Sequence, residues 1–159
     1  LGDVYKRQKL KYRTDINKIV VTGRFYKHLD YLNNMALSDS SIKVYNNISN
    51  MCDVMKKCDI AISAGGTTLA ELCACGIPTV CFSIADNQLY GTEAYSNDGL
   101  MLYAGDVRSQ KDMVIKRIID NLELLVQDYS LRQKMACKQK MIIDGKGSCR
   151  IAGEIIKLN

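Results

Sequence analysis

The chain has 159 residues, of which 47% are hydrophobic and 25% are charged, a balance typical of one soluble globular domain with a real core. No apolar run approaches the roughly 20 residues that span a bilayer, and no signal-peptide pattern opens the chain, so we expect no transmembrane segment. The net charge of +5 arises mainly from residues 1–13, which hold five Lys and Arg residues and one Asp. This indicates a basic tail and excludes a nucleic-acid-binding face.

The cysteines are seven in number and include no Cys-x-x-Cys pair. They lie at positions 52, 58, 73, 75, 81, 137 and 149. Cys81 lies in a predicted buried strand, and Cys73 and Cys75 are two apart on a predicted helix, so their side chains face different directions. Reduced thiols packed as small apolar residues explain this pattern better than disulfides or a zinc site. We therefore expect a cytoplasmic protein without a bound metal.

The start of the chain does not suit the fold that follows. Leu1 is not an initiator methionine, and residues 1–8 look like a translated adapter remnant of the kind found at the ends of some assembled reading frames. We therefore treat residues 1–16 as a non-native or truncated leader and expect the folded domain to span 17–159.

From residue 17 onward, short apolar runs alternate with amphipathic segments. Strands are predicted at about 18–22, 41–45, 59–63, 78–82 and 100–103, and helices at about 25–37, 50–57, 88–96, 110–126, 130–140 and 148–158, with one more between Thr67 or Thr68 and Gly76. Gly105-Asp106 predicts a turn, and Ser109 and Ser148 are expected to cap the helices that follow them. The alternation predicts an α/β fold, a Rossmann-like parallel sheet with helices on both faces.

The helix predicted at 110–126 carries the clearest apolar stripe of the chain. Its members are spaced three or four residues apart, as on one face of a helix. They are Met113, Ile115, Ile118, Ile119, Leu122 and Leu125.

The stretch 59–82 predicts a buried strand, a glycine turn, a helix and a second strand. Gly65 and Gly66 allow a tight turn and a close approach of the backbone to a bound group, because neither has a Cβ. Thr67 or Thr68 is expected to cap the helix, with Glu71 in its first turn. Such a turn directs free N–H groups at one point, where a phosphate can bind, and places Glu71 to accept hydrogen bonds from sugar hydroxyls. Spacing alone is equally compatible with a plain strand-to-helix turn in which Glu71 is a capping-box acid.

Three segments together resemble the C-terminal half of GT-B proteins that use UDP-sugars. They are 59–71 with Gly76-Ile77-Pro78, Ala85-Asp86-Asn87-Gln88, and Asp144-Gly145-Lys146-Gly147-Ser148 with Arg150. The last two segments narrow the resemblance to the UDP-sugar hydrolase of the pseudaminic acid pathway and its spore-coat polysaccharide relatives. The lipid II N-acetylglucosaminyltransferase is more distantly similar. The resemblance covers about residues 17–157.

The resemblance implies one UDP-sugar site just past the carboxyl ends of predicted strands. In it, Gly65, Gly66 and Thr67 would hold the diphosphate, and Glu71 would hold the ribose hydroxyls.

The remaining implied contacts come from two other loops. The backbone around Asn47 and Ile48 would border the uracil, and Asn87 and Gln88 would approach the sugar or the phosphates. Judged without the resemblance, Asn87 and Gln88 are also compatible with an ordinary helix start. Lys146 in its glycine loop is more typical of a solvated lysine than of a phosphate ligand.

The sequence departs from the family pattern at its beginning. The family domain opens with a strand and a glycine-rich loop before the strand seen here at 18–22, and neither is present. In a doubly wound sheet that first strand lies between the strands at 18–22 and 59–63. We therefore expect a gap between these two strands or their direct pairing, with Ile19, Val21 and Ile62 less buried than their type suggests.

No constellation of residues suggests that this chain acts alone as a catalyst. We find no paired carboxylates, Ser/His/Asp set or metal-ligand cluster, and the sole histidine, His28, is expected at the surface. We expect UDP-sugar binding without turnover or a cofactor, and a missing N-terminal catalytic domain as partner, fused or as a separate chain.

Three functions remain open. One is the nucleotide-binding half of a UDP-sugar hydrolase, which would release UDP from a UDP-linked deoxy amino sugar in bacterial surface-polysaccharide or nonulosonic acid biosynthesis. The second is the donor-binding half of a UDP-sugar glycosyltransferase. The third is a free-standing subunit that recruits a separate partner.

Overall fold

The computed structural model describes residues 15–157, so the expected leader at 1–16 lies almost wholly outside the described part of the chain. The chain divides into two compact units, a first unit that ends at Met51 and a second unit that begins at Cys52. Each unit holds its own parallel sheet. None of the helices within residues 15–157 is both long and apolar enough to cross a membrane.

The first unit is a β-α-β arrangement. Its elements are β1 (Lys18–Thr22), α2 (Leu29–Ser38) and β2 (Ile42–Asn46). The two strands pair in parallel from Lys18 opposite Ile42 to Thr22 opposite Asn46. The Lys18 ammonium secures the start of the sheet, because it donates to Asp39 Oδ2 at 3.1 Å and to Ser41 Oγ at 2.6 Å. The helix begins later than the predicted residue 25, since the Tyr26 N–H bonds to the Gly23 carbonyl in a turn.

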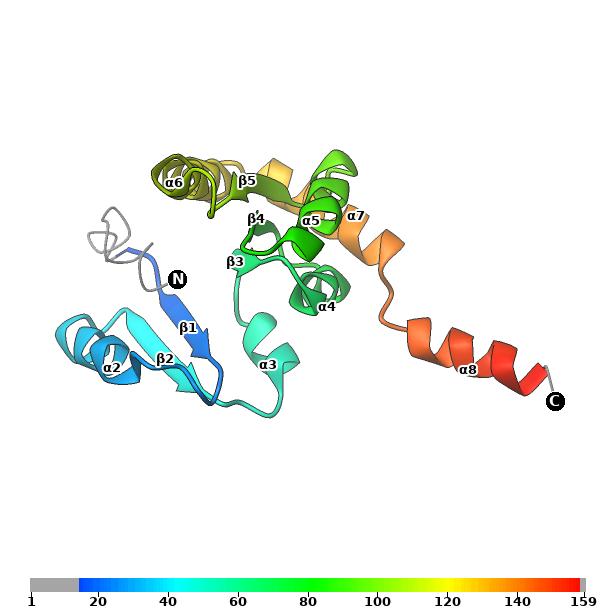
Figure 1. Ribbon diagram of the computed structural model, residues 1–159, viewed down its shortest axis with the longest axis horizontal. Helices are drawn as coiled ribbons and strands as arrows, with labels where there is room; N and C mark the ends of the chain where they lie inside the picture. Colours follow the sequence, from blue (N-terminus) through cyan, green and yellow to red (C-terminus); the bar gives the residue numbers. More distant parts are fainter. Residues whose placement is uncertain (1–14, 158–159) are drawn as a thin grey trace. The chain divides into compact units, whose positions relative to one another are not determined.

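The second unit alternates strands and helices. Its elements in order are α3 (Met51–Met55) at the boundary, β3 (Ala61–Ala64), α4 (Thr67–Cys75), β4 (Thr79–Ser83), α5 (Asp86–Asn97), β5 (Leu102–Asp106), α6 (Lys111–Gln127), α7 (Tyr129–Ile142) and α8 (Gly147–Lys157). The strands form a parallel sheet in the order β3-β4-β5. In Figure 1, α4 and α5 lie on one side of this sheet and α6 on the other. The predicted Rossmann-like α/β fold, with parallel strands flanked by helices, is confirmed.

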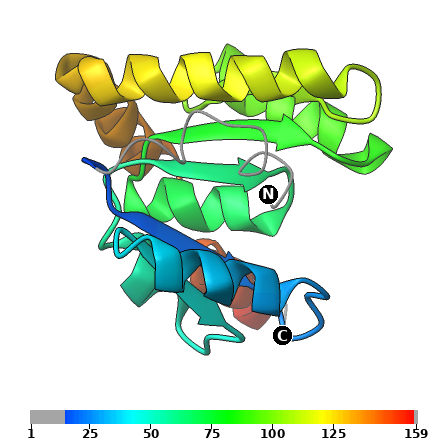
Figure 2. The same ribbon diagram turned by 90° about the vertical axis from the view of Figure 1, so that its left-hand side faces the viewer.

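The core of the second unit centres on β4. All five of its residues are buried, because strands flank both edges and helices cover both faces. The two polar ends of the strand are satisfied internally: Thr79 Oγ1 donates to the Ile77 carbonyl at 2.7 Å, and Ser83 Oγ lies 2.7 Å from Thr92 Oγ1. The long helix α6 runs along the sheet in Figure 2.

Two strands are less buried than their sequences suggest. β1 and β3 are each paired along one edge only in the part of the chain that the structure describes. Ile19, Val21 and Ile62 are all half-buried, as expected for strands with an open edge. The buried strand predicted at the start of the stretch 59–82 is wrong for the same reason, since all four residues of β3 are half-buried.

The turn predicted at Gly105-Asp106 is wrong. β5 begins two residues later than expected and runs through both positions. Gly105 has φ +117°, and the pairing of β4 with β5 changes register between Cys81 and Ser83. A glycine inside a strand often marks such an irregularity. The strand therefore bends at Gly105 and carries Asp106 to its carboxyl end.

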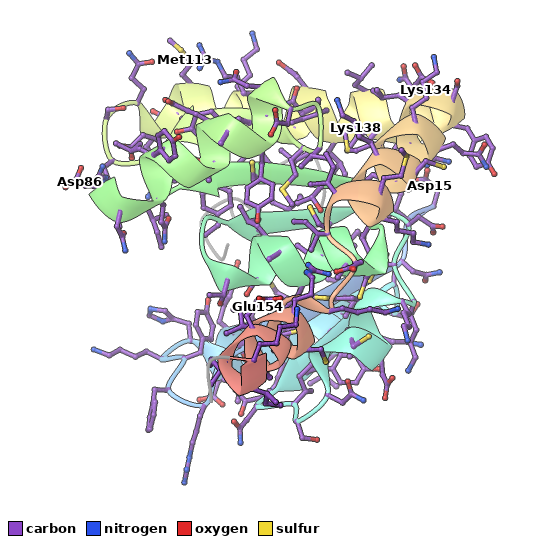
Figure 3. The ribbon with its side chains drawn as sticks, turned by 90° about the vertical axis from the view of Figure 1, so that its right-hand side faces the viewer. Asp15, Asp86, Met113, Lys134, Lys138 and Glu154 are labelled. Atoms are coloured by element: carbon purple, nitrogen blue, oxygen red, sulfur yellow. The ribbon has the colours of Figure 1, made fainter. Side chains whose placement is uncertain are left out.

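Two predicted caps and one predicted core residue are also wrong. The Ser109 hydroxyl donates to the Asp106 carbonyl, and α6 begins at Lys111 without a side-chain cap. Ser148 lies inside α8, which begins at Gly147. Met113 is 47% exposed and projects from the outer side of α6, whereas its neighbour Val114 is buried (Figure 3).

Candidate functional site

The loops that follow β3, β4 and β5 meet at the carboxyl edge of the second unit's sheet. The strands are parallel, so their carboxyl ends lie together. Backbone hydrogen bonds join the loops directly: the Gly65 N–H donates to the Phe82 carbonyl at 2.8 Å, and the Val107 N–H to the Ser83 carbonyl at 3.0 Å. This edge carries the glycine turn and the starts of α4 and α5.

The two glycines of the turn have different roles. Gly65 is buried, and a Cβ there would lie 2.8 Å from both Gln88 Cβ and Thr92 Cγ2 of α5. This position therefore requires glycine because α5 packs against it, and not because of a bound group. Gly66 has φ +143°, is exposed, and a Cβ there would meet nothing within 4 Å. The open side of the turn is at Gly66.

The N-terminus of α4 has no side-chain cap. Gly66 occupies the N-cap position and Thr67 is already the first helical residue, so the predicted cap by Thr67 or Thr68 is wrong. The Leu69 N–H bonds to the Gly66 carbonyl at 3.2 Å. The first N–H groups of a helix have no intrahelical acceptor, so those of Thr67 and Thr68 are available to a ligand. Together with the positive end of the helix they suit an anion.

Glu71 is not a capping-box acid. The first turn of α4 contains no acidic residue, and Glu71 lies four residues beyond Thr67, about 6 Å along the helix. Its side chain is exposed on the flank of α4 and lines a cavity of about 350 Å³. This position is compatible with hydrogen bonding of Glu71 to sugar hydroxyls, and it excludes the alternative that Glu71 is a capping-box acid.

The opposite wall of this cavity is the segment between α7 and α8. Ile142, Ile143, Asp144, Gly145, Gly147 and Arg150 line it together with Ala70, Glu71 and Ala74 of α4. Asp144 organises the segment, because its Oδ1 accepts from the Lys146 N–H at 2.9 Å and its Oδ2 from Arg150 Nη1 at 2.6 Å. The Arg150 hydrogen bond, followed by that of the Lys146 N–H, lowers the pKa of Asp144. The sequence pointed to this segment only through the family resemblance, and nothing in the sequence predicted that the segment lies beside Glu71.

The loop between β4 and α5 contributes a second uncapped helix start. α5 has Ala85 at its N-cap position and no side-chain cap. The Gln88 side-chain oxygen accepts from the Ile84 N–H at 2.9 Å and so holds the loop, which leaves its NH₂ group for a ligand. Asn87 is exposed at the same end of the helix. The structure thus brings Gln88 against Gly65.

Arg108 is a residue of this edge that the sequence reasoning missed. Its Nη2 lies 2.8 Å from Asp86 Oδ1 and 2.7 Å from Asp106 Oδ2. Hydrogen bonds from Arg108 lower the pKa of both carboxyl groups. Figure 3 shows Asp86 at the outer end of α5. A predicted strand that ended at Asp106 would have pointed to Arg108, because that residue then lies two positions past the carboxyl end of the strand.

Asn47 and Ile48 belong to the first unit, where they follow the carboxyl end of β2. Asn47 is exposed in the left-handed region with φ +52°, and its N–H donates to the Thr22 carbonyl at 3.0 Å. Asparagine is one of the few residues besides glycine that adopt this conformation readily. Ile48 is half-buried, and His28 is exposed as predicted.

Comparison with known families identifies the chain. The family model described as "Protein of unknown function (DUF354)" matches residues 4–144. The chain belongs to the DUF354 family. The match extends from before β1 to Asp144, so it includes the glycine turn, Glu71 and Arg108 of this DUF354 chain and ends before α8.

The DUF354 chain is also similar to individual proteins. It is 25% identical over 137 residues to the spore coat polysaccharide biosynthesis protein SpsG of Bacillus subtilis (strain 168), an alignment covering 86% of this chain and 40% of the relative. Two UDP-N-acetylglucosamine–N-acetylmuramyl-(pentapeptide) pyrophosphoryl-undecaprenol N-acetylglucosamine transferases also match. That of Limosilactobacillus fermentum (strain NBRC 3956 / LMG 18251) is 33% identical over 107 residues, 64% of this chain and 28% of the relative. That of Oenococcus oeni (strain ATCC BAA-331 / PSU-1) is 42% identical over 67 residues, 39% of this chain and 17% of the relative. The chain thus spans less than half the length of each of these proteins.

Proposed function

We propose that this chain is the donor-binding part of a glycosyltransferase-like enzyme of polysaccharide biosynthesis, and that its ligand is a UDP-sugar. The observation that carries the proposal is the uncapped start of α4, open on the side of Gly66, with Glu71 one turn further along the same helix beside a cavity. The names of the relatives support the ligand class, since they include polysaccharide biosynthesis and transfer from UDP-N-acetylglucosamine.

In the proposed complex, the diphosphate lies at the N-terminus of α4. The N–H groups of Thr67 and Thr68 donate to its oxygens, and the helix dipole favours its negative charge. Gly66 leaves room for this approach, because nothing stands where its Cβ would be. The Gln88 NH₂ group, held at the same edge, is the proposed donor to the sugar or to a phosphate oxygen, with Asn87 beside it.

The ribose lies along α4 toward Glu71. A carboxylate accepts hydrogen bonds but repels phosphate, so its distance of about 6 Å from the helix start suits hydroxyl groups. Asn47 and Ile48 are proposed to border the uracil, on the strength of the resemblance alone.

The reaction depends on the acceptor. Transferases and hydrolases of UDP-sugars use the same donor site and differ in whether a hydroxyl group or water attacks the sugar. We favour transfer, because two of the three relatives described above are transferases. The attacking group and its base are proposed to lie on a further domain, fused or separate. The chain by itself is therefore expected to bind UDP without releasing it from a UDP-sugar.

Calorimetric titration of UDP into wild-type protein, Glu71→Gln and Glu93→Gln tests the site. The first substitution keeps the shape of the side chain and removes its charge, which should weaken UDP binding by about 1–3 kcal/mol. Glu93 is exposed on α5, and its variant should bind as the wild type does.

The outcomes separate the parts of the proposal. Absence of UDP binding to the wild-type chain would contradict it outright. Equal affinities of wild type and Glu71→Gln would remove Glu71 from the site. Weaker binding of UDP with unchanged binding of uridine would assign Glu71 to the phosphates. Release of UDP from a UDP-sugar without an acceptor would favour the hydrolase.

A further inference from the structure

Two cysteine side chains meet in the second unit. Cys52 lies on α3 and Cys75 is the last residue of α4, and their sulfur atoms are 3.6 Å apart. Both side chains are half-buried. The two positions are 23 residues apart in the sequence and form no Cys-x-x-Cys pair, so only the fold brings them together.

The other cysteines of the second unit have different surroundings. Cys73, two residues before Cys75, is fully buried. The Cys58 thiol donates to the Val54 carbonyl at 3.4 Å. Cys137 and Cys149 are exposed on α7 and α8. The contact between Cys52 and Cys75 is therefore selective among these cysteines.

We propose that Cys52 and Cys75 are a redox modification site, which forms an intramolecular disulfide by exchange with a low-molecular-weight disulfide such as oxidised glutathione. One thiolate attacks a sulfur of the small disulfide, forms a mixed disulfide and releases one small thiol. The second protein thiolate then attacks the mixed disulfide, forms the Sγ–Sγ bond and releases the second small thiol. The protein loses two protons and two electrons, and the small disulfide is reduced to two thiols.

The geometry requires a small movement. A disulfide bond is about 2.05 Å long, so the sulfurs must approach by about 1.5 Å. α3 has only five residues, and Cys75 lies at the very end of α4, where Gly76 takes over in the left-handed conformation. A bond between them would close a ring that contains β3, both glycines of the turn and Glu71. Oxidation would thus tie α3 to the helix that carries the candidate site.

The reaction should be slow at neutral pH. Burial, then hydrogen bonding to Cys52, raises the pKa of Cys75, and the nearby Glu71 acts in the same direction while Lys56 opposes it. A raised pKa leaves the thiol mainly protonated at neutral pH, and the thiolate is the nucleophile. Exchange should therefore accelerate as the pH rises above neutral.

Peptide mapping without reduction tests the site directly. The experiment uses the full chain with Cys137→Ser and Cys149→Ser, which removes exposed thiols that would link separate molecules. The folded protein is treated with oxidised glutathione, alkylated and digested with trypsin. Cleavage after Lys43, Lys56, Lys57 and Arg108 gives one peptide, 44–56, with Cys52 alone, and another, 58–108, with Cys58, Cys73, Cys75 and Cys81. The two should be found joined, and a reducing agent should separate them.

Further variants identify the partner of Cys52. Cys75→Ser should abolish the joined peptides, whereas Cys58→Ser and Cys73→Ser should retain them. The same oxidation in denaturant should distribute Cys52 among several partners, so selectivity depends on the folded state. Joined peptides that persist in folded Cys75→Ser would overturn the proposal. So would the absence of joined peptides from the oxidised Cys137→Ser, Cys149→Ser protein, provided that its circular dichroism shows it to be folded.

Discussion

Gln139 of α7 joins two strands of the second unit through one side chain. It is fully buried, and its Nε2 donates to the carbonyls of Ile77 at 3.1 Å and Leu100 at 2.7 Å. These residues precede β4 and β5, so the amide holds the amino ends of both strands. Its Oε1 has no hydrogen-bond partner among residues 15–157, and the two donated bonds are what offset the burial of the group.

Replacing Gln139 with Met should destabilise the protein. Methionine has a similar length but donates no hydrogen bond, so the buried Leu100 carbonyl would lose this donor and the Ile77 carbonyl would keep only the one from Thr79 Oγ1. We expect the free energy of unfolding to fall by about 1–3 kcal/mol in guanidinium denaturation. Gln133→Met on the exposed side of α7 is the control and should change the stability by no more than about 0.5 kcal/mol. Equal stability of the two variants would show that the Gln139 contacts contribute nothing.

The glycine turn shows how far single residues can be predicted. The pair Gly65-Gly66 correctly indicated a turn between a strand and a helix. Only the placement of α5, through Gln88 and Thr92, reveals that Gly65 is required by packing and that Gly66 faces open space. The roles of the two residues depend on a helix more than twenty positions along the chain, which local sequence cannot specify.

The helix α6 illustrates what a periodic pattern establishes at the scale of an element. Five of the six residues predicted for its buried face are buried: Ile115, Ile118, Ile119, Leu122 and Leu125. The exception is Met113. Helix geometry alone would have removed it from the buried face, because each residue turns the helix by about 100°. Relative to Ile118, Val114 lies only about 40° away, whereas Met113 lies about 140° away.

A pair of truncations on α6 tests this face. Leu125 is fully buried, so Leu125→Ala should lower the free energy of unfolding by about 2–5 kcal/mol through lost burial and a cavity. Met113 is 47% exposed, so Met113→Ala should change it by no more than about 0.5 kcal/mol. Denaturant titration of both variants provides the comparison. Similar losses for the two would mean that Met113 is covered in solution.

The ends of elements were predicted less well than their existence. Gly105 suggested a turn because glycine favours turns, yet here it bends a strand with φ +117°. Ser109 has the chemistry of a helix cap, but its hydroxyl bonds to the carbonyl of Asp106 instead. For Gly105 the pairing with β4 decides the outcome, and pairing between strands is not visible in a local pattern.

At the scale of the whole molecule, the sequence predicted the class of fold. It did not predict the cavity beside Glu71. That cavity joins α4 to the segment 142–150, about seventy residues further along the chain, and it exists because α7 packs against α4. The Asp144–Arg150 ion pair shapes one wall of the cavity. The positions of these two residues in the sequence do not predict that Glu71 lies on the opposite wall.

The engagement of Arg108 by Asp86 and Asp106 has a consequence for the ionic strength dependence of ligand binding. The chain has no lysine or arginine between Lys57 and Arg108, and both Arg108 and Arg150 are already paired with carboxylates. A diphosphate at the start of α4 would then be held by neutral N–H groups and a helix dipole that acts only over the first turn. Added salt screens exposed charges most strongly. The affinity for UDP should therefore fall only modestly between low and high sodium chloride in calorimetric titrations, and a steep loss would show that a lysine or arginine side chain takes part.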